Sequence, residues 1–418
     1  MWINSSNTFA NTFYFHLMYL RPLLLALIVS CLLIFTGINA NAAQKLSGKA
    51  RVSLITCGQG PDLYEAFGHT AIRVYDPENG INNAYNYGIF SFNQANFYAN
   101  FAMGHLWYRL GVNDFDRFVY SYEYHKRSVY EQVLNFDQEQ KQALFDTLER
   151  NRLPENRYYL YNYFFHNCST IPRDIIELAS GHTIEYSYKG EKFKAGKSIR
   201  QLVDEYIIHN SWGNFGIDIA LGAEIDEKAT FHEYLYLPEY LMDAFASATI
   251  MANGKKKPLV QKTLIHYQSD VDYMKENISP GPITVFWLFF GLLALLTLWG
   301  FKTRNAFKGI DFLFFLILGL NGSVLFFISF FTDHTATENF NLLWNLPTHL
   351  VFAFVLLRKK QGKFISLYLM LTIFLCLISL ADDLILPQNF HPAVIPVLLT
   401  IILRSSFLLY HNKLNPKE

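Results

Sequence analysis

The sequence has few cysteines and no excess of charge, and both shortages exclude classes of protein. Only 4 cysteines occur among 418 residues, which is too few for a disulfide framework. Lysine plus arginine and aspartate plus glutamate each number 35, so the basic excess typical of nucleic-acid binding is missing and we expect no nucleic-acid partner. The sequence also lacks a His-Glu-x-x-His motif and a phosphate-binding glycine loop, so we expect no metal and no cofactor.

What the sequence does have is a long apolar stretch near its start. Leu23 to Phe35 is apolar and is followed by Ala40-Asn41-Ala42-Ala43, a pattern typical of signal-peptidase cleavage, which we place after Ala42. Residues 1–43 are therefore a signal peptide or, if uncleaved, an N-terminal anchor. The segment before Cys31 resembles a lipobox, but apolar residues continue past this cysteine, so we interpret the match as chance.

Residues 44–280 have the composition of a soluble domain. Alternating apolar residues predict strands, and apolar spacing with capping residues predicts helices. The predicted strands are Arg51–Thr56, Thr70–Tyr75 and Asn83–Phe92, and the predicted helices are Asp137–Asn151 and Ser169–Leu178. Strands followed by helices indicate an α+β fold. Residues 251–280 are polar and lysine-rich, and we interpret them as the approach to a membrane.

Residues 281–418 are dominated by apolar stretches and predict an all-α transmembrane domain with about five helices. The stretches are Pro282–Gly300, Ile310–Phe331, Leu342–Leu357, Phe364–Leu380 and Ala393–Tyr410. The third is short and contains Pro347, so it is the weakest. Basic residues fill alternate loops, which places those loops in the cytoplasm and the large domain outside. We expect a multi-pass protein of the inner membrane with a periplasmic N-terminal domain.

Two segments of the soluble domain have residues suited to catalysis. Phe67-Gly68-His69-Thr70 places a histidine at the start of a strand, and His166-Asn167-Cys168-Ser169 places a cysteine at the start of a helix. A helix N-terminus lowers the pKa of a thiol and supplies N–H donors for an oxyanion. A histidine from a strand can take the thiol proton, as in cysteine acyl-transfer enzymes. A structural histidine and a buried apolar cysteine are the simpler interpretation of either residue alone.

Other residues compete for these roles. His166 is an alternative base, but residues two apart rarely face each other near a helix start, so His69 is preferred. Cys57 follows a strand-like stretch and precedes a glycine-rich turn. A disulfide between Cys57 and Cys168 would remove the nucleophile, so the enzyme hypothesis predicts that Cys57 is free.

The combination of motifs resembles one known family. The matching segments are Thr56-Cys57-Gly58-x-Gly60, Phe67 to Val74, Tyr85-Asn86-Tyr87-Gly88-x-Phe90, Asn167-Cys168-Ser169-Thr170-x-Pro172-Arg173-Asp174, Trp212-x-x-Phe215-Gly216-Ile217-Asp218, Leu221-Gly222-x-x-x-Asp226, Asp333-His334 and Asn341-Leu342-Leu343-Trp344-x-x-Pro347. They resemble the Lnb-type lipoprotein N-acyltransferases of Bacteroidetes over nearly the whole chain after residue 43. Ile171 departs from the pattern, which has an arginine there.

The resemblance implies a fold and an activity. The periplasmic domain would be a circularly permuted papain-like domain, in which the histidine strand precedes the cysteine helix. Cys168 would take an acyl chain from a membrane phospholipid as a thioester and pass it to the N-terminal amine of a diacylglyceryl-cysteine lipoprotein, with His69 as base and then acid. Asn86 would orient His69 as the third catalytic residue, with Glu65 and Glu123 as alternatives.

The resemblance also indicates substrate-binding residues. Asn167 would support the oxyanion or cap the following helix, and capping is favoured. Arg173 would contact a lipid headgroup or pair with Asp174. His334, Asn341 and Trp344 would form a lipid-binding floor beneath the catalytic domain, or only a polar and aromatic belt at the membrane boundary.

Two further functions remain open on this sequence. One is a membrane-anchored cysteine hydrolase, a peptidase, amidase or lipase, on the same scaffold. The other is a membrane receptor or assembly factor in which the motifs only stabilise the fold. A cysteine-to-serine change at residue 168 separates the receptor hypothesis from the two enzyme hypotheses, because both enzymes would lose function while the protein is still expressed.

Overall fold

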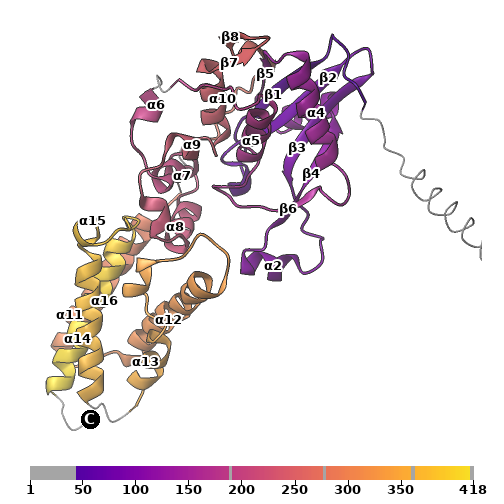
Figure 1. Ribbon diagram of the computed structural model, residues 1–418. Helices are drawn as coiled ribbons and strands as arrows, with labels where there is room; N and C mark the ends of the chain where they lie inside the picture. Colours follow the sequence, from indigo (N-terminus) through magenta and orange to yellow (C-terminus); the bar gives the residue numbers. More distant parts are fainter. Residues whose placement is uncertain (1–43, 188–190, 276–278, 359–362, 415–418) are drawn as a thin grey trace, which may run out of the picture. The chain divides into compact units, whose positions relative to one another are not determined.

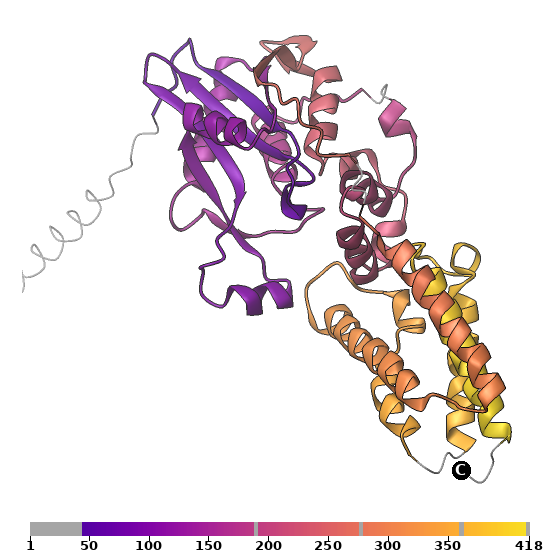
Figure 2. The ribbon, with the colours of Figure 1, turned by 180° about the vertical axis from the view of Figure 1, so that it is seen from behind.

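The computed structural model of the chain describes residues 44–187, 191–275, 279–358 and 363–414. The predicted signal peptide or anchor at residues 1–43 lies outside the described residues, as do Lys359, Lys360 and Lys417, which contributed to the topology argument. Leu46–Glu418 forms one unit. Figures 1 and 2 show it from opposite sides.

A seven-stranded sheet forms the first half of the described chain, and every adjacent pair in it is antiparallel. Its order is β6-β4-β3-β2-β1-β5-β9. The strands are β1 (Arg51–Cys57), β2 (His69–Asp76), β3 (Ile81–Ile89), β4 (Trp107–Asp114), β5 (Val129–Leu134), β6 (Tyr158–Leu160) and β9 (Val260–Tyr267). Because side chains alternate along a strand, each face of the sheet presents its own set of residues.

Helices cover both faces of this sheet. Helices α4 (Gln138–Asn151), α5 (Thr170–Ala179) and α10 (Pro238–Ser247) share a buried core with Leu54 of β1 and Ile72 of β2. Figure 1 shows α4 and α5 side by side on this face. The opposite face packs on α3 (Phe115–Tyr124), and Figure 2 shows it from that side. Both faces are thus buried, which fixes the strand register.

A group of short elements lies between α5 and β9 in the chain. It comprises α6 (Glu191–Lys194), α7 (Ile199–Ile207), α8 (Ser211–Ala220), η2 (Ala223–Asp226), α9 (Phe231–Tyr234), and a hairpin of β7 (Thr249–Ala252) and β8 (Lys255–Pro258). Three-residue helix η1 (Leu63–Glu65) and helix α2 (Phe97–Met103) lie earlier in the chain, each in a connection between strands.

The predicted strands and helices of this half are confirmed to within a few residues, and the fold is α+β. Asp137 begins α4 with a capping box to Gln140. The interpretation of residues 251–280 as the approach to a membrane missed a strand. β9 lies within them and forms an edge strand on β5, and its polar residues are explained by its exposure there.

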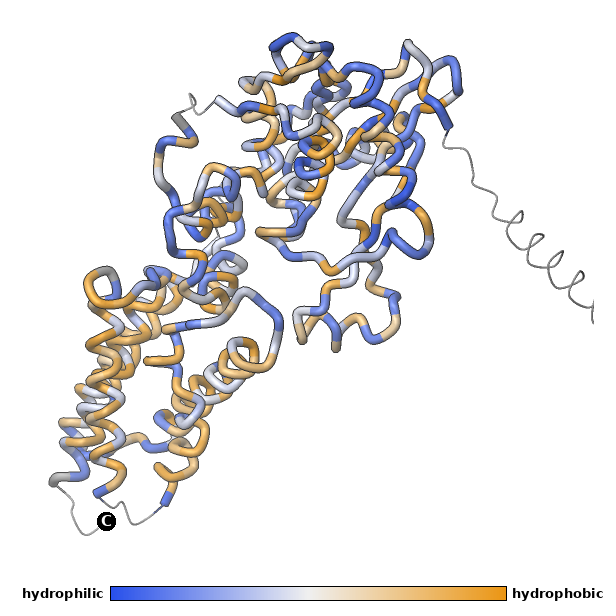
Figure 3. The backbone as a smooth tube through the Cα atoms, viewed as in Figure 1, coloured by the Kyte–Doolittle hydropathy of each residue, from blue (hydrophilic) through white to orange (hydrophobic). Residues whose placement is uncertain are grey.

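The second half is helical and apolar, as Figure 3 shows by the orange of its helices. It contains α11 (Pro282–Thr303), α12 (Lys308–Phe331), η3 (Phe340–Leu343), α13 (His349–Leu356), α14 (Lys363–Ser379), α15 (Asp382–Ile385) and α16 (Val394–Leu414). Within the described ranges, three helices are long and apolar enough to cross a membrane: α11, α12 and residues 394–412 of α16. Helix α14 is apolar but shorter.

The third predicted apolar segment, Leu342–Leu357, is not a single helix. It begins in η3, passes through Pro347 and continues as the eight-residue α13. Proline removes a backbone N–H and disfavours helical geometry in the residue before it, which explains the break. This segment was the weakest of the five helix predictions, in part because it contains Pro347.

A buried ion pair that the sequence analysis did not identify joins three of these helices. Arg404 of α16 donates from Nε and Nη2 to the carboxylate of Asp311 on α12, at 2.7 and 2.8 Å. Its Nη1 also donates to Thr297 of α11 at 2.7 Å. Both charged residues are at most 1% exposed. Such groups occur among apolar helices only when paired and hydrogen-bonded.

Candidate active site

Cys168 lies at the start of α5 and is 8% exposed. The preceding Asn167 accepts, through Oδ1, hydrogen bonds from the backbone N–H groups of Ser169 and Thr170 at 2.8 and 2.9 Å. Its Nδ2 donates to the carbonyl oxygens of Tyr163 and Tyr236 at 2.8 and 2.9 Å. All four hydrogen-bonding positions of this amide are therefore used within the protein. The favoured capping role of Asn167 is confirmed, and its side chain offers no free donor to a substrate.

His69 is the first residue of β2 and reaches the same point from the sheet. Arg73 of β2 pairs with Ala84 of β3, so their side chains lie on the same face of the sheet. His69 is four residues from Arg73 and Asn86 is two residues from Ala84, and because every second residue of a strand faces the same way, both lie on that face too. His69 Nε2 lies 2.5 Å from Asn86 Oδ1. Since the amide oxygen can only accept, Nε2 carries the proton, and Nδ1 is left to act on another group.

The thiol of Cys168 interacts with that histidine. Burial raises the pKa of the thiol, but the charge of His69, its hydrogen bond, the Thr70 backbone N–H and the Tyr161 hydroxyl together lower it below its usual value. The residue after His69 fixes the two elements together, because Thr70 Oγ1 lies 2.8 Å from Ser169 Oγ in a buried contact. Asn86, His69 and Cys168 thus form a contiguous set that favours a thiolate.

Gly88 lies against both Cys168 and His69. Its φ is +95°, a backbone conformation that residues with a side chain rarely adopt. A Cβ at this position would lie 3.5 Å from Cβ of Cys168 and 3.7 Å from Cε1 of His69. These are ordinary contact distances, so the positive φ is what favours glycine here. A glycine within a strand pattern often marks a close approach of another segment, so the glycine of Tyr-Asn-Tyr-Gly was a sequence signal of this contact.

Aromatic rings line the other side of Cys168. Tyr161 stacks on Tyr108 of β4 with ring centroids 4.3 Å apart, and Tyr163 meets Tyr161 edge to face at 5.4 Å. Burial, followed by the nearby Cys168, raises the pKa of Tyr161 well above its ordinary value. This hydroxyl therefore stays protonated and can donate to an anion beside the sulfur. Tyr161 lay outside every motif in the sequence, and only the fold identifies it.

Cys57 is the neighbour of His69 across β1 and β2, but it has the properties of a structural cysteine. Burial raises the pKa of its thiol to about 12. Cys57 and Cys168 are both free, as the enzyme hypothesis predicted for Cys57. A thiol that stays protonated at neutral pH is a poor nucleophile, so the geometry favours Cys168.

The alternative catalytic candidates are engaged elsewhere or exposed. Glu65 pairs with Arg127 at 2.6 Å, and Glu123 is exposed on α3. His166 Nδ1 lies 3.1 Å from the carbonyl oxygen of Leu160, so its ring is fixed to β6. The structure joins only Asn86, among the three proposed orienting residues, to His69.

Arg173 is held within the protein. Its Nε and Nη2 bond the carboxylate of Asp174 at 2.8 and 2.7 Å, and Nη1 donates to the carbonyl oxygen of His232 at 2.9 Å. The pairing with Asp174 that the sequence offered as an alternative is confirmed. The Arg173 side chain is 11% exposed, which leaves little of it for a lipid headgroup.

The three candidates in the membrane half lie in different surroundings. His334 Nε2 is 2.9 Å from the carbonyl oxygen of Phe101, at the end of α2. Asn341 and Trp344 are 1% and 3% exposed, and Trp344 Nε1 donates to Asn341 Oδ1 at 3.1 Å. These two side chains pack inside the helical half, so they support its structure and present no exposed surface to a lipid.

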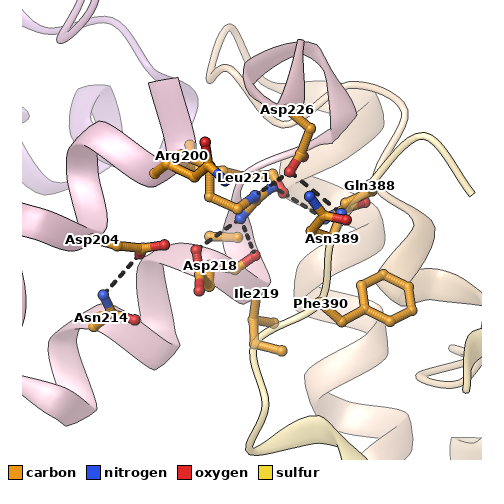
Figure 4. Close-up of polar contacts among 12 residues, drawn as sticks. Arg200, Asp204, Asn214, Asp218, Ile219, Leu221, Asp226, Gln388, Asn389 and Phe390 are labelled. Atoms are coloured by element: carbon orange, nitrogen blue, oxygen red, sulfur yellow. Dashed lines mark hydrogen bonds and ion pairs between the residues drawn. The ribbon is translucent and has the colours of Figure 1, made fainter. Parts of the chain in front are cut away.

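A second polar cluster, drawn in Figure 4, accounts for two of the motif aspartates. Arg200 of α7 donates from Nε and Nη2 to the carboxylate of Asp226 at 2.8 and 3.0 Å, and from Nη1 to Asp218 at 2.8 Å. Gln388, from the loop between α15 and α16, donates to the carbonyl oxygen of Leu221 at 3.0 Å. This cluster, which we call the Arg200 junction, joins α7, α8 and η2 to the membrane half.

Gly222 brings the backbones together at the same junction. Its N–H donates to the carbonyl oxygen of Thr335 at 3.3 Å, and a Cβ on it would overlap Thr337. Asp204 of α7 lies beside this cluster and accepts from Asn214 at 2.9 Å. Burial, with the charge of Asp218, raises the pKa of Asp204 to about 6. These motif residues therefore belong to a structural joint, separate from the catalytic set.

Among the residues that the structure describes, no group of three or more histidine, cysteine, aspartate or glutamate side chains is placed to hold a metal ion. The expectation that no metal takes part remains a prediction about the reaction.

Comparisons with known proteins divide the chain in the same way as its two halves. A family model described as the Lnb N-terminal periplasmic domain matches residues 40–203. A second, described as the Lnb transmembrane domain, matches residues 274–415. No match was found among curated proteins or among solved structures.

Proposed function

Because the chain belongs to the Lnb-type family of membrane proteins with a periplasmic domain, we propose that it is a lipoprotein N-acyltransferase with Cys168 as its nucleophile. The observation that carries the proposal is the Asn86–His69–Cys168 set, in which the thiol has a lowered pKa. The aromatic shell around the sulfur suits an acyl chain, and the attached membrane half suits a donor and an acceptor that both reside in the bilayer. We assign the domain to the circularly permuted papain-like plan, since His69 precedes Cys168.

The first half-reaction transfers an acyl chain to the enzyme. The Cys168 thiolate attacks the ester carbonyl carbon of a phospholipid and forms a C–S bond, while the C–O bond to the glycerol breaks. His69, protonated at Nδ1, gives that proton to the departing lysophospholipid oxygen. We assign the Cys168 backbone N–H, at the helix start, and the Tyr161 hydroxyl as donors to the oxyanion. The product is a thioester on Cys168.

The second half-reaction passes the chain to the lipoprotein. The neutral amine of the diacylglyceryl-cysteine attacks the thioester carbonyl and forms an amide bond, and the C–S bond breaks. His69 takes the proton lost by the amine, and Cys168 leaves as a thiolate, which restores the starting ion pair. A thiolate is a good leaving group, so the thioester favours transfer to an amine. Asn86 keeps the imidazole oriented in both steps.

We place the protein in the inner membrane with the catalytic domain on the periplasmic side. Helices α11, α12 and α16 would cross the bilayer, and α14 and the η3–α13 segment would complete five crossings. Support comes from two basic residues, Lys302 in the last turn of α11 and Arg304 just after it, which indicate that this end of the helix is cytoplasmic. That orientation puts the end of α12, and the loop that follows it, on the same side as Cys168.

The test is mass spectrometry of a reporter lipoprotein made in cells that lack their own N-acylation. We expect the wild-type chain to add the mass of one acyl chain to the N-terminal cysteine of the reporter. The Cys168→Ala and His69→Ala variants should add none, whereas Cys376→Ala, a buried cysteine of the membrane half, should behave as wild type.

Two outcomes would overturn the proposal. A well-expressed, membrane-inserted wild type that adds no acyl chain rejects the transferase. Release of free fatty acid, dependent on Cys168 and without a mass gain on the reporter, would indicate the hydrolase instead, since the two activities differ only in the acceptor of the thioester.

A further inference from the structure

A segment between β3 and β4 exposes aromatic rings beside the membrane half. Residues 90–107, which we call the aromatic segment, contain no aspartate, glutamate, lysine or arginine among 18 positions. Phe92, Tyr98, Phe101 and Trp107 are 58%, 78%, 45% and 44% exposed. Such a concentration of uncharged, exposed aromatic surface is unusual for a water-facing loop and typical of an element at a membrane interface.

The aromatic segment is fixed to the outer end of a membrane helix. The N–H of Asp333, just after α12, donates to the carbonyl oxygen of Met103 at 2.9 Å. His105 pairs with Asp333 at 3.1 Å, and His334 lies 2.9 Å from the Phe101 carbonyl oxygen. A span of the length of α12 ends at the lipid–water boundary. These contacts therefore hold the aromatic segment at the depth where tyrosine and tryptophan are favoured.

A continuous row of rings joins this boundary to the thiol. Tyr161, beside Cys168, stacks on Tyr108 at 4.3 Å, and Tyr108 stacks on Phe90 at 5.0 Å. The row then continues to Phe97 at 6.3 Å, to Phe101 at a further 6.0 Å and to His334 at 6.2 Å. Tyr108 and Phe97 are buried, Tyr161 and Phe90 are half-buried, and Phe101 is 45% exposed, so the row reaches the protein surface at Phe101.

We propose that the aromatic segment seats in the outer interface of the bilayer and that its row of rings receives the acyl chain of a phospholipid on the way to Cys168. The seating follows from the exposed rings and their attachment to α12, and is independent of the reaction. The delivery of the acyl chain rests on the proposed function. This route would keep the acyl chain of the phospholipid out of water, because the acyl chain would leave its lipid neighbours for contacts with aromatic rings.

The seating is tested by photo-crosslinking of the full-length protein in membranes. Benzoylphenylalanine replaces Tyr98 in one sample and Tyr120 in another, since Tyr120 on α3 is also exposed, at 65%. We expect phospholipid adducts at position 98 and none at position 120. Equal labelling at both positions, or none at 98, would overturn the seating. Adducts of position 98 with a lipoprotein in place of lipid would also overturn it, and would assign the surface to the acceptor.

The delivery is tested by the rate of acyl loading on Cys168, measured by intact mass. A Tyr98→Asp/Phe101→Asp variant is compared with Tyr120→Asp/Tyr124→Asp in vesicles of phosphatidylethanolamine and phosphatidylglycerol. We expect the first pair to load about tenfold more slowly, equivalent to about 1.4 kcal/mol, and the second pair to load as wild type. With a water-soluble short-chain ester, all three proteins should load equally.

The outcomes separate the two proposals. Equal loading of both variants from vesicles would overturn the delivery and leave the transferase intact. Equal losses with vesicles and with the soluble ester would also overturn it, because the defect would lie in the site or the fold. A wild type that loads from neither donor would reject the proposed function, while the crosslinks at position 98 would still decide the seating.

Discussion

The carboxyl group of Asp204 should make stability depend on pH, and its removal should raise stability at neutral pH. In the folded chain the pKa of Asp204 is about 6, because burial and the charge of Asp218 disfavour its ionised form. Its unfolded value is 3.8. Between these values the folded state holds a proton that the unfolded state has lost, so stability falls as pH rises through this window. Above about pH 6 both states are ionised and the loss is constant.

The size of the effect follows from the two pKa values. The two pKa values differ by about two, which corresponds to about 3 kcal/mol in the free energy of unfolding before any allowance for solvent. Partial access of water to the carboxyl reduces this to roughly 2 kcal/mol. An Asp204→Asn side chain can still accept the hydrogen bond that Asn214 donates, so the substitution removes the charge and keeps the contact. We therefore expect Asp204→Asn to be more stable than wild type above pH 6 and equal to it near pH 4.

The assay is thermal unfolding of the detergent-solubilised full chain at a series of pH values from 4 to 8. The difference in Tm between Asp204→Asn and wild type should be near zero at pH 4 and grow to roughly 2–5 °C by pH 7. Glu224→Gln, at an exposed carboxyl of η2, is the matched control and should show no such trend. A difference that does not vary with pH, or a variant less stable than wild type at pH 8, would refute the reasoning.

Three further predictions concern the catalytic set and the membrane half. Cys168 should react with iodoacetamide at pH values below those at which an ordinary thiol reacts, whereas Cys57 should stay unmodified until the chain unfolds. Peptide mass spectrometry measures the modification of both cysteines. Equal reactivity of the two would contradict the assignment of Cys168 as the nucleophile. Asn86→Ala should slow acyl transfer about 10- to 100-fold, because a hydrogen bond to a charged group contributes about 1.5–3 kcal/mol. It should also move Cys168 alkylation to higher pH, and an unchanged alkylation profile would exclude an orienting role. Arg404→Met should destabilise the chain by about 3–5 kcal/mol by leaving Asp311 buried and unpaired, and an added Asp311→Leu should restore much of the loss in Tm.

The sequence was most informative where a residue's role depends on its own segment. Alternating apolar residues located β1, β2 and β3, and the capping residue Asp137 located the start of α4. Cys168 was placed at a helix start and His69 at a strand start from a few neighbouring residues each. Because β2 and β3 are adjacent antiparallel strands, Asn86 was also within reach of a prediction. Local pattern therefore accounts for Cys168 and His69, whereas Asn86 was proposed from the family resemblance.

Pairs that are far apart in the chain were not predictable in the same way. Arg404 and Asp311 are separated by 93 positions, and nothing in either segment indicates the other. A charged residue within an apolar stretch nevertheless indicates that a buried partner exists, although it does not say which residue the partner is. Nothing in the sequence around Tyr161 indicates its role, because its position beside Cys168 depends on how the segment between β6 and α5 folds. The edge strand β9 was missed because its exposed face is polar, as in a linker.

Several motif residues outside the catalytic set meet at the Arg200 junction. Arg200 is 4% exposed and satisfies Asp218 and Asp226, while Gly222 allows two backbones to approach where any side chain would collide. Together they join the periplasmic helices to loops of the membrane half. A reaction between a buried thiol and a bilayer lipid requires a fixed distance from the bilayer, since a misplacement of about 1 Å can cost about a hundredfold in rate. The Arg200 junction and the attachment of the aromatic segment to Asp333 hold the domain to the membrane half at two separate points. Two attachments constrain a domain's orientation as well as its distance, and motif residues of both halves, Gly222 and Asp333, take part in them.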